Sequence, residues 1–145
     1  MSNYFIKDCI TLKESPGCGL GVFATKDIPA GTAIECAPVL VMNMKDTKLI
    51  GDTFLYNYYF NWGDSSRLSA IVLGWGSMYN HSYDPTCKYE TDYEDKTFKV
   101  ITRKAVKKGE EVTINYNFYP EDQSPLWFNT KEIKSKTSDS KKKKK

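Results

Sequence analysis

Short runs of β-branched and aromatic residues alternate with Gly, Pro, Asn and Asp along most of the chain. Such runs between turn-forming residues are typical of β-strands. They predict strands over residues 4–12, 21–25, 32–44, 86–93, 97–103 and 112–118. Helical periodicity is weak, so only residues 52–60 and 67–79 are predicted as short helices, and Gly74 and Gly76 interrupt the second. The pattern therefore predicts a mainly β fold of small sheets joined by turns.

One internal similarity links two of the predicted turns. Residues 25–31 (TKDIPAG) resemble residues 102–109 (TRKAVKKG). We interpret this as the same strand-turn-strand chemistry used twice, because a repeat protein needs self-similarity over a longer period.

The length of 145 residues fits one domain and a tail, because single domains usually hold about 100 to 200 residues. We expect the domain over residues 1–130 and a basic tail over residues 131–145. With 40% hydrophobic residues, the chain can bury a core. No stretch approaches the roughly 20 apolar residues of a membrane span, and the first residues do not resemble a signal peptide. We therefore expect a soluble intracellular protein.

The net charge of +3 is divided unevenly along the chain. Residues 131–145 carry a charge of +6, and residues 1–130 carry −3. The acidic body favours a cationic partner over nucleic acid. The tail is typical of a solvated low-complexity segment without fixed structure. Nuclear targeting, contact with nucleic acid and anchoring to an acidic surface remain alternatives for it.

The distribution of cysteine and histidine argues against a metal site. The four cysteines are far apart and form no CxxC pair, and His81 is the single histidine. A zinc site needs a closer set of such ligands. We therefore expect no metal and reduced, mostly buried thiols, and one imidazole restricts the possible acid and base chemistry.

Three segments carry more information than ordinary β sequence. Ser15–Ala24 has three glycines at alternate positions, Gly74–Pro85 ends an apolar stretch in Asn-His-Ser, and Gly109–Tyr116 continues a Gly-Glu-Glu turn into a strand. Each has an ordinary explanation when taken alone: a tight turn, a buried element that leaves through an Asx turn, and an edge strand.

Together and in this order, the three segments resemble the SET domain of protein lysine methyltransferases. The resemblance extends from about Lys7 to Phe128 and is strongest to the minimal SET proteins of large algal viruses and some bacteria. It implies a fold of small β-sheets with a C-terminal pseudoknot, in which the segment around Tyr116 passes beside Asn80 and His81.

The chain departs from many members of this family at its C-terminal end. Tyr83 stands where many relatives have a zinc-binding Cys, and no cysteine-rich segment follows the last motif. We therefore expect no zinc module. The aromatic residues available to cover the site instead are Phe118, Tyr119, Trp127 and Phe128.

The resemblance implies S-adenosylmethionine as the methyl donor. Implied contacts with its amino acid end come from the main chain of Gly17, Cys18, Gly19 and Leu20. The Asn80 amide has the donors and the acceptor to join them. In similar proteins the main chain at the His81 position contacts adenine. Trp127 is placed to stack on the adenine, although a hydrophobic plug is an equally good explanation for it.

Tyr116 resembles the family's catalytic tyrosine. Its phenol has an ordinary pKa of about 10 and is a poor base at neutral pH, so we expect it to orient the lysine amine and to contact the donor methyl group. Tyr58 is expected as a second catalytic and channel residue, although aromatic runs are usually core. Phe118 and Ile114 are predicted to line the substrate channel. Ile114 lies two residues before the tyrosine. The number of methyl groups added to the lysine stays open, and we slightly favour multiple methylation.

An acidic body beside a lysine channel suits an extended basic peptide added along a strand edge. The resemblance suggests a histone H3 tail as the substrate, which implies action in the nucleus. A ribosomal or other basic protein is the alternative substrate. It also suggests a homodimer. Two other classes remain: a SET-fold module that binds peptides without catalysis, and a nucleic-acid binder that acts through its tail.

Overall fold

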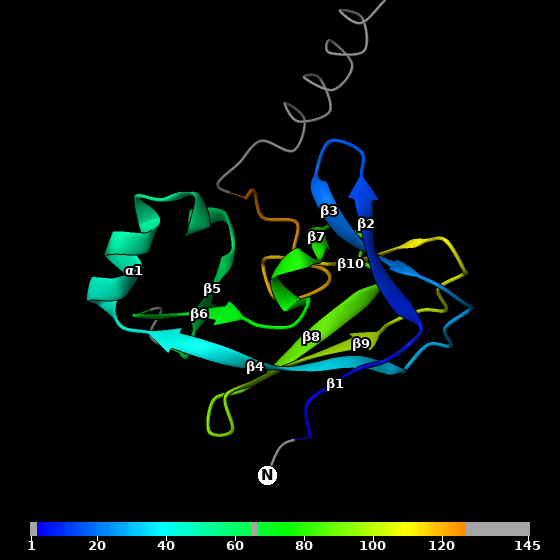
Figure 1. Cartoon of the computed structure of the whole chain (residues 1–145), viewed down its shortest axis with the longest axis horizontal. Coiled ribbons are helices and arrows are strands. Elements are labelled where there is room, and N and C mark those ends of the chain that lie inside the picture. Colours follow the sequence, from blue (N-terminus) through cyan, green and yellow to red (C-terminus); the bar gives the residue numbers. More distant parts are fainter. Residues whose placement is uncertain (1–2, 65–66, 127–145) are drawn as a thin grey trace, which may run out of the picture.

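The fold is described for residues 3–64 and 67–126 of a computed structural model (Figure 1). Its larger sheet consists of β1 (Phe5–Ile6), β4 (Ala33–Met42), β5 (Tyr59–Trp62), β6 (Leu68–Val72), β8 (Cys87–Asp92) and β9 (Thr97–Thr102). The strand order is β5-β6-β4-β9-β8, and β1 pairs with β4. The smaller sheet, in the order β2-β3-β10-β7, consists of β2 (Ile10–Ser15), β3 (Gly19–Ala24), β7 (Asn80–His81) and β10 (Glu111–Ile114). The predicted mainly β fold is confirmed.

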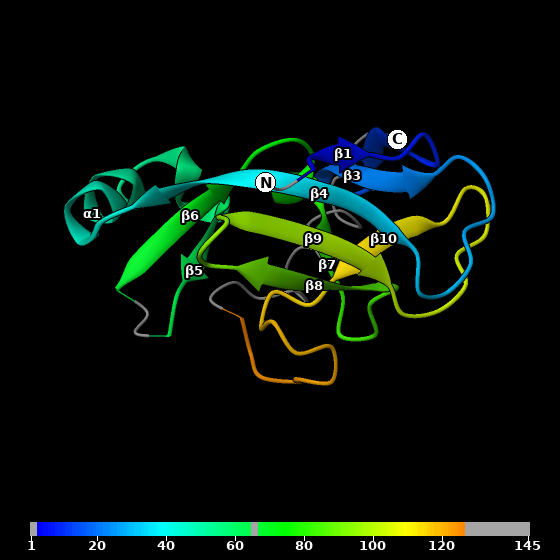
Figure 2. The same ribbon diagram turned by 90° about the horizontal axis from the view of Figure 1, so that it is seen from below.

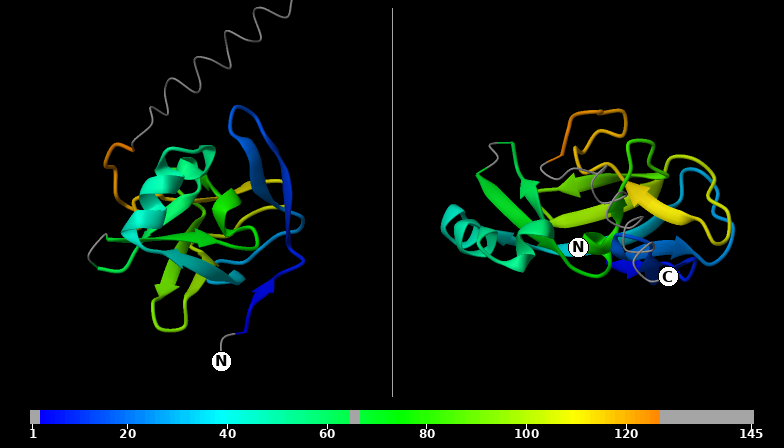
Figure 3. Two further views of the ribbon diagram at one scale, coloured as in Figure 1. Left: turned by 60° about the vertical axis from the view of Figure 1, so that its left-hand side comes forward. Right: turned by 90° about the horizontal axis from the view of Figure 1, so that it is seen from above.

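Strand β4 connects the two halves of the larger sheet. Its first half pairs with β9, as in Ala37 with Phe98, and its second half pairs with β6, as in Val39 with Val72. Helix α1 (Met44–Gly51) and the hairpin of β2 and β3 lie towards opposite ends of β4 (Figure 2, Figure 3). The larger sheet thus ends in two edge strands, β5 and β8.

The helix predictions were wrong in detail. Residues 52–60 form the short 3₁₀ helix η1 (Phe54–Asn57) and then strand β5, and residues 67–79 form strand β6 and the 3₁₀ helix η2 (Gly76–Met78). Strands β5 and β6 pair with each other, and β6 pairs with β4. These long-range pairings decide the conformation of short apolar runs, which local periodicity does not resolve.

The α-helix α1 was missed, because its first residue falls at the end of a predicted strand. The Asn43 side chain caps this helix by accepting a hydrogen bond from the Asp46 amide at 2.9 Å. None of the residues of this helix is buried, so it lacks the core-facing stripe that makes a helical period easy to recognise. The cap was therefore the available sequence signal. Predicted strand 4–12 also divides, into β1 and β2.

The two similar turns lie against each other. Ile28 and Val106 form an isolated antiparallel bridge with N–H to O distances of 2.7 and 2.8 Å. The Asp27 carboxylate accepts the Lys108 amide at 2.9 Å. Both bridging side chains are buried, so the repeated turn sequence joins the two sheets at one end of the core.

The core contains one fully buried carboxylate among its apolar residues. Glu35 in β4 has no exposed surface, and it accepts the Trp75 amide at 2.8 Å and the Tyr79 hydroxyl at 2.6 Å. Burial raises the pKa of Glu35, while these two hydrogen bonds act in the opposite direction. Gly74, with φ of +63°, allows the main chain to approach this carboxylate closely.

The sequence also made predictions about thiols, metal ions and membrane spans. Cys9, Cys36 and Cys87 are buried free thiols, and Cys18 is exposed. Within residues 3–64 and 67–126, no group of His, Cys, Asp and Glu side chains is suited to hold a metal ion. In the same residues, no helix has the length and apolar character to cross a membrane.

We expect Gly74→Ala to lower the free energy of unfolding by about 2 to 4 kcal/mol. The new Cβ would lie 2.5 Å from a Glu35 carboxylate oxygen, in a backbone conformation that alanine rarely adopts. Urea denaturation measures the change. Gly31→Ala is the matched control, because Gly31 also has positive φ but has nothing within 4 Å of an added Cβ, and it should cost only about 1 kcal/mol. Equal costs for the two variants would contradict the proposed role of the Glu35 contact.

Candidate active site

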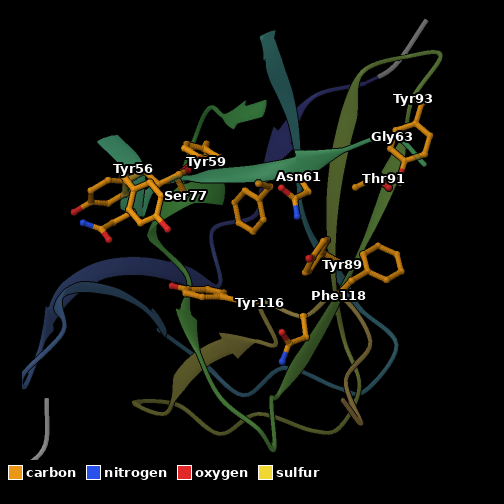
Figure 4. A pocket seen from close by; sticks show the side chains of 14 residues that line it. Tyr56, Tyr59, Asn61, Gly63, Ser77, Tyr89, Thr91, Tyr93, Tyr116 and Phe118 are labelled. Atoms are coloured by element: carbon orange, nitrogen blue, oxygen red, sulfur yellow. Dashed lines mark hydrogen bonds between the residues drawn. The ribbon is translucent and has the colours of Figure 1, made fainter. Parts of the chain in front are cut away.

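A cavity of about 540 Å³ lies between the edge strands β5 and β8 and the segment that follows β10 (Figure 4). Tyr116 lies towards one end of the cavity, and Tyr93 and Gly63 lie at the other. The side chains and main chain that line it belong to Tyr56, Asn57, Tyr58, Tyr59, Phe60, Asn61, Gly63, Ser77, Tyr89, Thr91, Tyr93, Tyr116, Asn117 and Phe118. Most are aromatic, so the cavity offers an apolar environment with a few hydroxyl and amide groups.

Tyr116 is fixed at both its main chain and its hydroxyl. Its amide donates to Nδ1 of His81 at 3.0 Å, and its hydroxyl donates to the main-chain oxygen of Tyr79 at 2.7 Å. Burial raises the pKa of Tyr116 well above its ordinary value, and the proximity of Cys18 and Tyr58 acts in the same direction. The phenol is therefore protonated at neutral pH and serves as a hydrogen-bond donor, not as a base.

His81 is neutral and has one unpartnered nitrogen. Because Nδ1 accepts the Tyr116 amide, the proton of the neutral ring is assigned to Nε2. This Nε2 atom is buried and has no hydrogen-bond partner among the described residues. Burial also lowers the pKa of His81 to about 4. The His81 ring packs edge-on against Tyr83, with 4.4 Å between the ring centroids. Together with the hydrogen bond from the Tyr116 amide, this contact indicates that His81 serves to hold Tyr116 in position.

Asn80 is oriented by a carboxylate from the last motif. Its Nδ2 donates to Glu111 at 2.7 Å and to the main-chain oxygen of Leu20 at 3.2 Å, and Ser15 Oγ donates to the other Glu111 oxygen at 3.1 Å. A Cβ on Gly21 would collide with both Glu111 and Asn80. Both hydrogens of the Asn80 amide are engaged, so its Oδ1 is the atom that it presents as an acceptor.

The glycine segment forms a tight turn beside Asn80. The Ser15 oxygen accepts the Cys18 amide at 3.0 Å across Pro16 and Gly17, and Gly17 has φ of 81°. Proline followed by a glycine with positive φ is typical of a type II turn. Gly19 also has positive φ, and an added Cβ there would meet nothing within 4 Å. The main chain of this turn is therefore open to a ligand.

Parallel pairing brings the motifs together. Residues Thr113 and Ile114 of β10 pair with Asn80 and His81 of β7. The chain after β10 then returns over Tyr83, whose hydroxyl donates to Ser124 and whose oxygen accepts Gln123. The predicted neighbourhood of Tyr116, Asn80 and His81 is thus present in the structure.

The predicted site residues differ in where they lie. Tyr58, Tyr116 and Phe118 line the cavity, whereas Ile114 is fully buried and is not among its lining residues. Ile114 pairs with His81 where β10 meets β7, and its part in the substrate channel stays a prediction. Trp127 lies outside the described residues, as do Phe128 and the basic tail.

Sequence analysis missed most of the cavity wall and the support of Asn80. The missed lining residues are Tyr56, Asn57, Tyr59, Phe60, Asn61, Gly63, Ser77, Tyr89, Thr91, Tyr93 and Asn117. The alternation of aromatic or hydroxyl residues with acidic ones in β8 was a usable signal for part of this set. Pairing of Asn80 with Glu111 had no local signal, because it depends on contact between distant segments.

Comparison with known proteins identifies the family. A model of the SET domain matches residues 19–117. The chain is 31% identical over 124 residues to "Histone-lysine N-methyltransferase, H3 lysine-37 specific" of Schizosaccharomyces pombe, which covers 85% of this chain and 79% of that protein. It is 32% identical over 124 residues to "Histone-lysine N-methyltransferase 2D" of Homo sapiens, covering 80% of this chain and 2% of that protein.

A solved structure adds a likeness of fold. The crystal structure of a Plasmodium falciparum protein assigned as a histone methyltransferase has a TM-score of 0.59 and 21% identity, covering 86% of this chain and 100% of that chain. The SET match includes Gly19, Asn80, His81 and Tyr116; Asn80 bonds to Leu20 next to Gly19, and His81 bonds to Tyr116, which lines the cavity. On this match and this similarity, the chain belongs to the SET domain family.

Proposed function

We propose that this protein is a protein-lysine N-methyltransferase that moves a methyl group from S-adenosylmethionine to the ε-amine of a lysine in a basic protein. The observation that carries the proposal is the position of the Tyr116 hydroxyl, bonded to the Tyr79 oxygen at one end of an aromatic cavity. The relatives named as histone-lysine methyltransferases support the same activity. A histone H3 tail is the substrate to test first.

The described residues fit S-adenosylmethionine on three observations. The turn at Gly19 has an open main chain, Asn80 presents Oδ1 as an acceptor for an ammonium group, and His81 Nε2 is buried with no hydrogen-bond partner in the described part of the chain. The main chain of the glycine turn and Asn80 would hold the amino acid end of the donor. The main chain at His81 would contact the adenine, and Trp127 remains the proposed stacking residue.

When bound, the donor supplies a methyl group activated by a sulfonium. The protein then has to align a lysine amine with it and exclude water. The cavity lowers the pKa of an entering lysine because its aromatic lining solvates an ammonium poorly. The Tyr79 oxygen and the Tyr116 hydroxyl orient the neutral amine, with Tyr58 beside them, and the amine's extra proton leaves to solvent before it enters.

The substrate is proposed to bind as an extended strand between β5 and β8. Both are edge strands of the larger sheet, and their side chains line the cavity. Edge strands bind extended peptides through main-chain hydrogen bonds, and alternate side chains enter pockets. No observation favours the alternative of a SET-fold module without catalysis, because Tyr116, Asn80 and His81 stand together.

The wider biological role belongs to the same proposal. Action on a histone would place the protein in the nucleus, and the +6 charge of residues 131–145 suits a weak contact with nucleic acid. A homodimer is also proposed. Sedimentation at micromolar concentration tests it, and a monomer alone would exclude it.

We expect Tyr116→Phe to lower kcat by about 100-fold, because the amine loses the hydroxyl that orients it. Calorimetry should show an unchanged affinity for S-adenosylmethionine. Methylation of core histones with labelled donor measures the activity. Tyr119→Phe is the control, because Tyr119 is 65% exposed and does not line the cavity. Full activity of the Tyr116→Phe enzyme would remove the basis of the proposal.

Gly21→Ala should weaken donor binding by about tenfold or more, which corresponds to about 1.4 kcal/mol. The new Cβ displaces the Glu111 carboxylate and the Asn80 amide that it orients. Isothermal titration with S-adenosylmethionine gives the affinity. Gly51→Ala serves as the control, since it has open space around an added Cβ and lies in α1. An unchanged affinity in Gly21→Ala would show that the Asn80 amide does not hold the donor.

The value of kcat/KM should rise about tenfold between pH 7 and pH 8, because only the substrate lysine titrates towards its neutral form there. Burial raises the pKa of Tyr116 far above this range, and the pKa of His81, at about 4, lies below it. Initial rates at subsaturating peptide across pH 6 to 9 measure the profile. A bell-shaped curve centred near pH 7 would indicate a general base that the described site does not contain.

A further inference from the structure

The cavity contains no charged side chain among the described residues that line it. This is unexpected, because the sequence places a dense acidic segment in the same region, and we had predicted an acidic surface beside the lysine channel. Strand β8 explains the difference. Its Tyr89 lines the cavity and Thr91 borders both the cavity and a second hollow of about 390 Å³, whereas Glu90 and Asp92 border only that second hollow, together with Asp95 and Lys99. The strand therefore directs its carboxylates away from the substrate cavity.

The cavity is also longer than one lysine side chain requires. It follows β5 from Tyr59 and reaches Gly63 just after the strand, and Asn61 and Thr91 lie between Tyr116 and the far end at Tyr93 (Figure 4). Four residues of strand span about 13 Å, at about 3.3 Å per residue. In an extended peptide, every second side chain points to the same face. A peptide whose lysine reaches Tyr116 therefore places its second neighbour in the same cavity.

We propose that this enzyme selects an uncharged residue two positions from the target lysine, on the side of the lysine that extends towards Tyr93. This inference rests on the proposed function. Asn61 in β5 and Thr91 in β8 are the specificity-determining residues, because they flank that position from opposite strands with neutral polar groups. A charged side chain there loses water and finds no opposite charge, which is costly.

The residues directly next to the target lysine face the opposite way, out of the cavity. A basic side chain at those positions keeps its water and is attracted by the acidic body, which carries −3 over residues 1–130. The favoured substrate is therefore a basic segment in which a charge lies beside the lysine but not two residues away. This pattern is narrower than the general class of basic peptides.

The experiment compares peptides that contain one lysine and differ at a single neighbouring position. Ala, Arg or Glu is placed in turn at the first and second positions on each side of the lysine, which gives four positions in all. The value of kcat/KM is measured for each peptide with the full chain. At the second position on one side, Arg and Glu should each lower kcat/KM by at least about tenfold relative to Ala. Arg next to the lysine should change it by less than about threefold. Equal values for Ala, Arg and Glu at both second positions would overturn the proposal.

A charge introduced into the cavity should change the selection. In Asn61→Asp, the ratio of kcat/KM for the Arg peptide to that for the Ala peptide should rise by at least about tenfold, and Thr91→Asp should have the same effect. Asn3→Asp is the matched control, because Asn3 lines the second hollow and not the cavity, so the same charge is added outside the cavity. Equal ratios in Asn61→Asp and Asn3→Asp would overturn the proposal. If donor binds but no peptide or histone is methylated, the proposed function itself fails, and the selection fails with it.

Discussion

The parallel pairing of β7 with β10 is the contact on which the site depends. Each strand is very short, yet Asn80 and His81 meet Thr113 and Ile114 there. The pairing sets Tyr116 directly beyond the end of β10, where its amide reaches His81 Nδ1. Few hydrogen bonds hold these strands, so packing must supply the rest, and Ile114 has no exposed surface. The buried end of β10 thus fixes the position of the Tyr116 hydroxyl.

A second constraint fixes the other partner of that hydroxyl. Glu35 is buried and forms no ion pair with any cation among the described residues, but its two oxygens accept hydrogen bonds from the Trp75 amide and the Tyr79 hydroxyl. Replacing such a carboxylate by an apolar residue often costs little stability, so stability alone is a weak reason for it. Its position suggests a different reason. By holding Tyr79 from within the core, Glu35 keeps the main-chain oxygen of that residue aimed at Tyr116, so a rigid carbonyl meets the substrate amine.

Sequence patterns predicted the strands and motifs well where the signal was local, and poorly where distant contacts decided. Alternation located β8 and β9, and the glycine turn before β3 was evident from Pro16 and Gly17. By contrast, the aromatic run around Phe60 has no clear period, and only its pairing with β6 makes it a strand. The alternation in β8 was a local signal for part of one cavity wall, but the cavity as a whole had none, because two edge strands far apart in sequence form its walls. The same holds for Glu111, whose partner Asn80 lies 31 residues away.

The separation of charge from the cavity resolves two opposing requirements of lysine methylation. A basic substrate is attracted over distances up to a Debye length of about 8 to 10 Å, which favours an acidic protein surface. At the point of reaction the amine must be neutral, and a carboxylate nearby would stabilise the ammonium and raise the lysine pKa. Strand β8 meets both demands, with Glu90 and Asp92 on one side and Tyr89 on the other. Aromatic faces still attract an ammonium at the entrance, by about 0.5 to 2 kcal/mol. That attraction is too weak to offset the loss of water deeper in the cavity, so the lysine is attracted to the entrance as a cation and releases its proton to solvent before its amine reaches Tyr116.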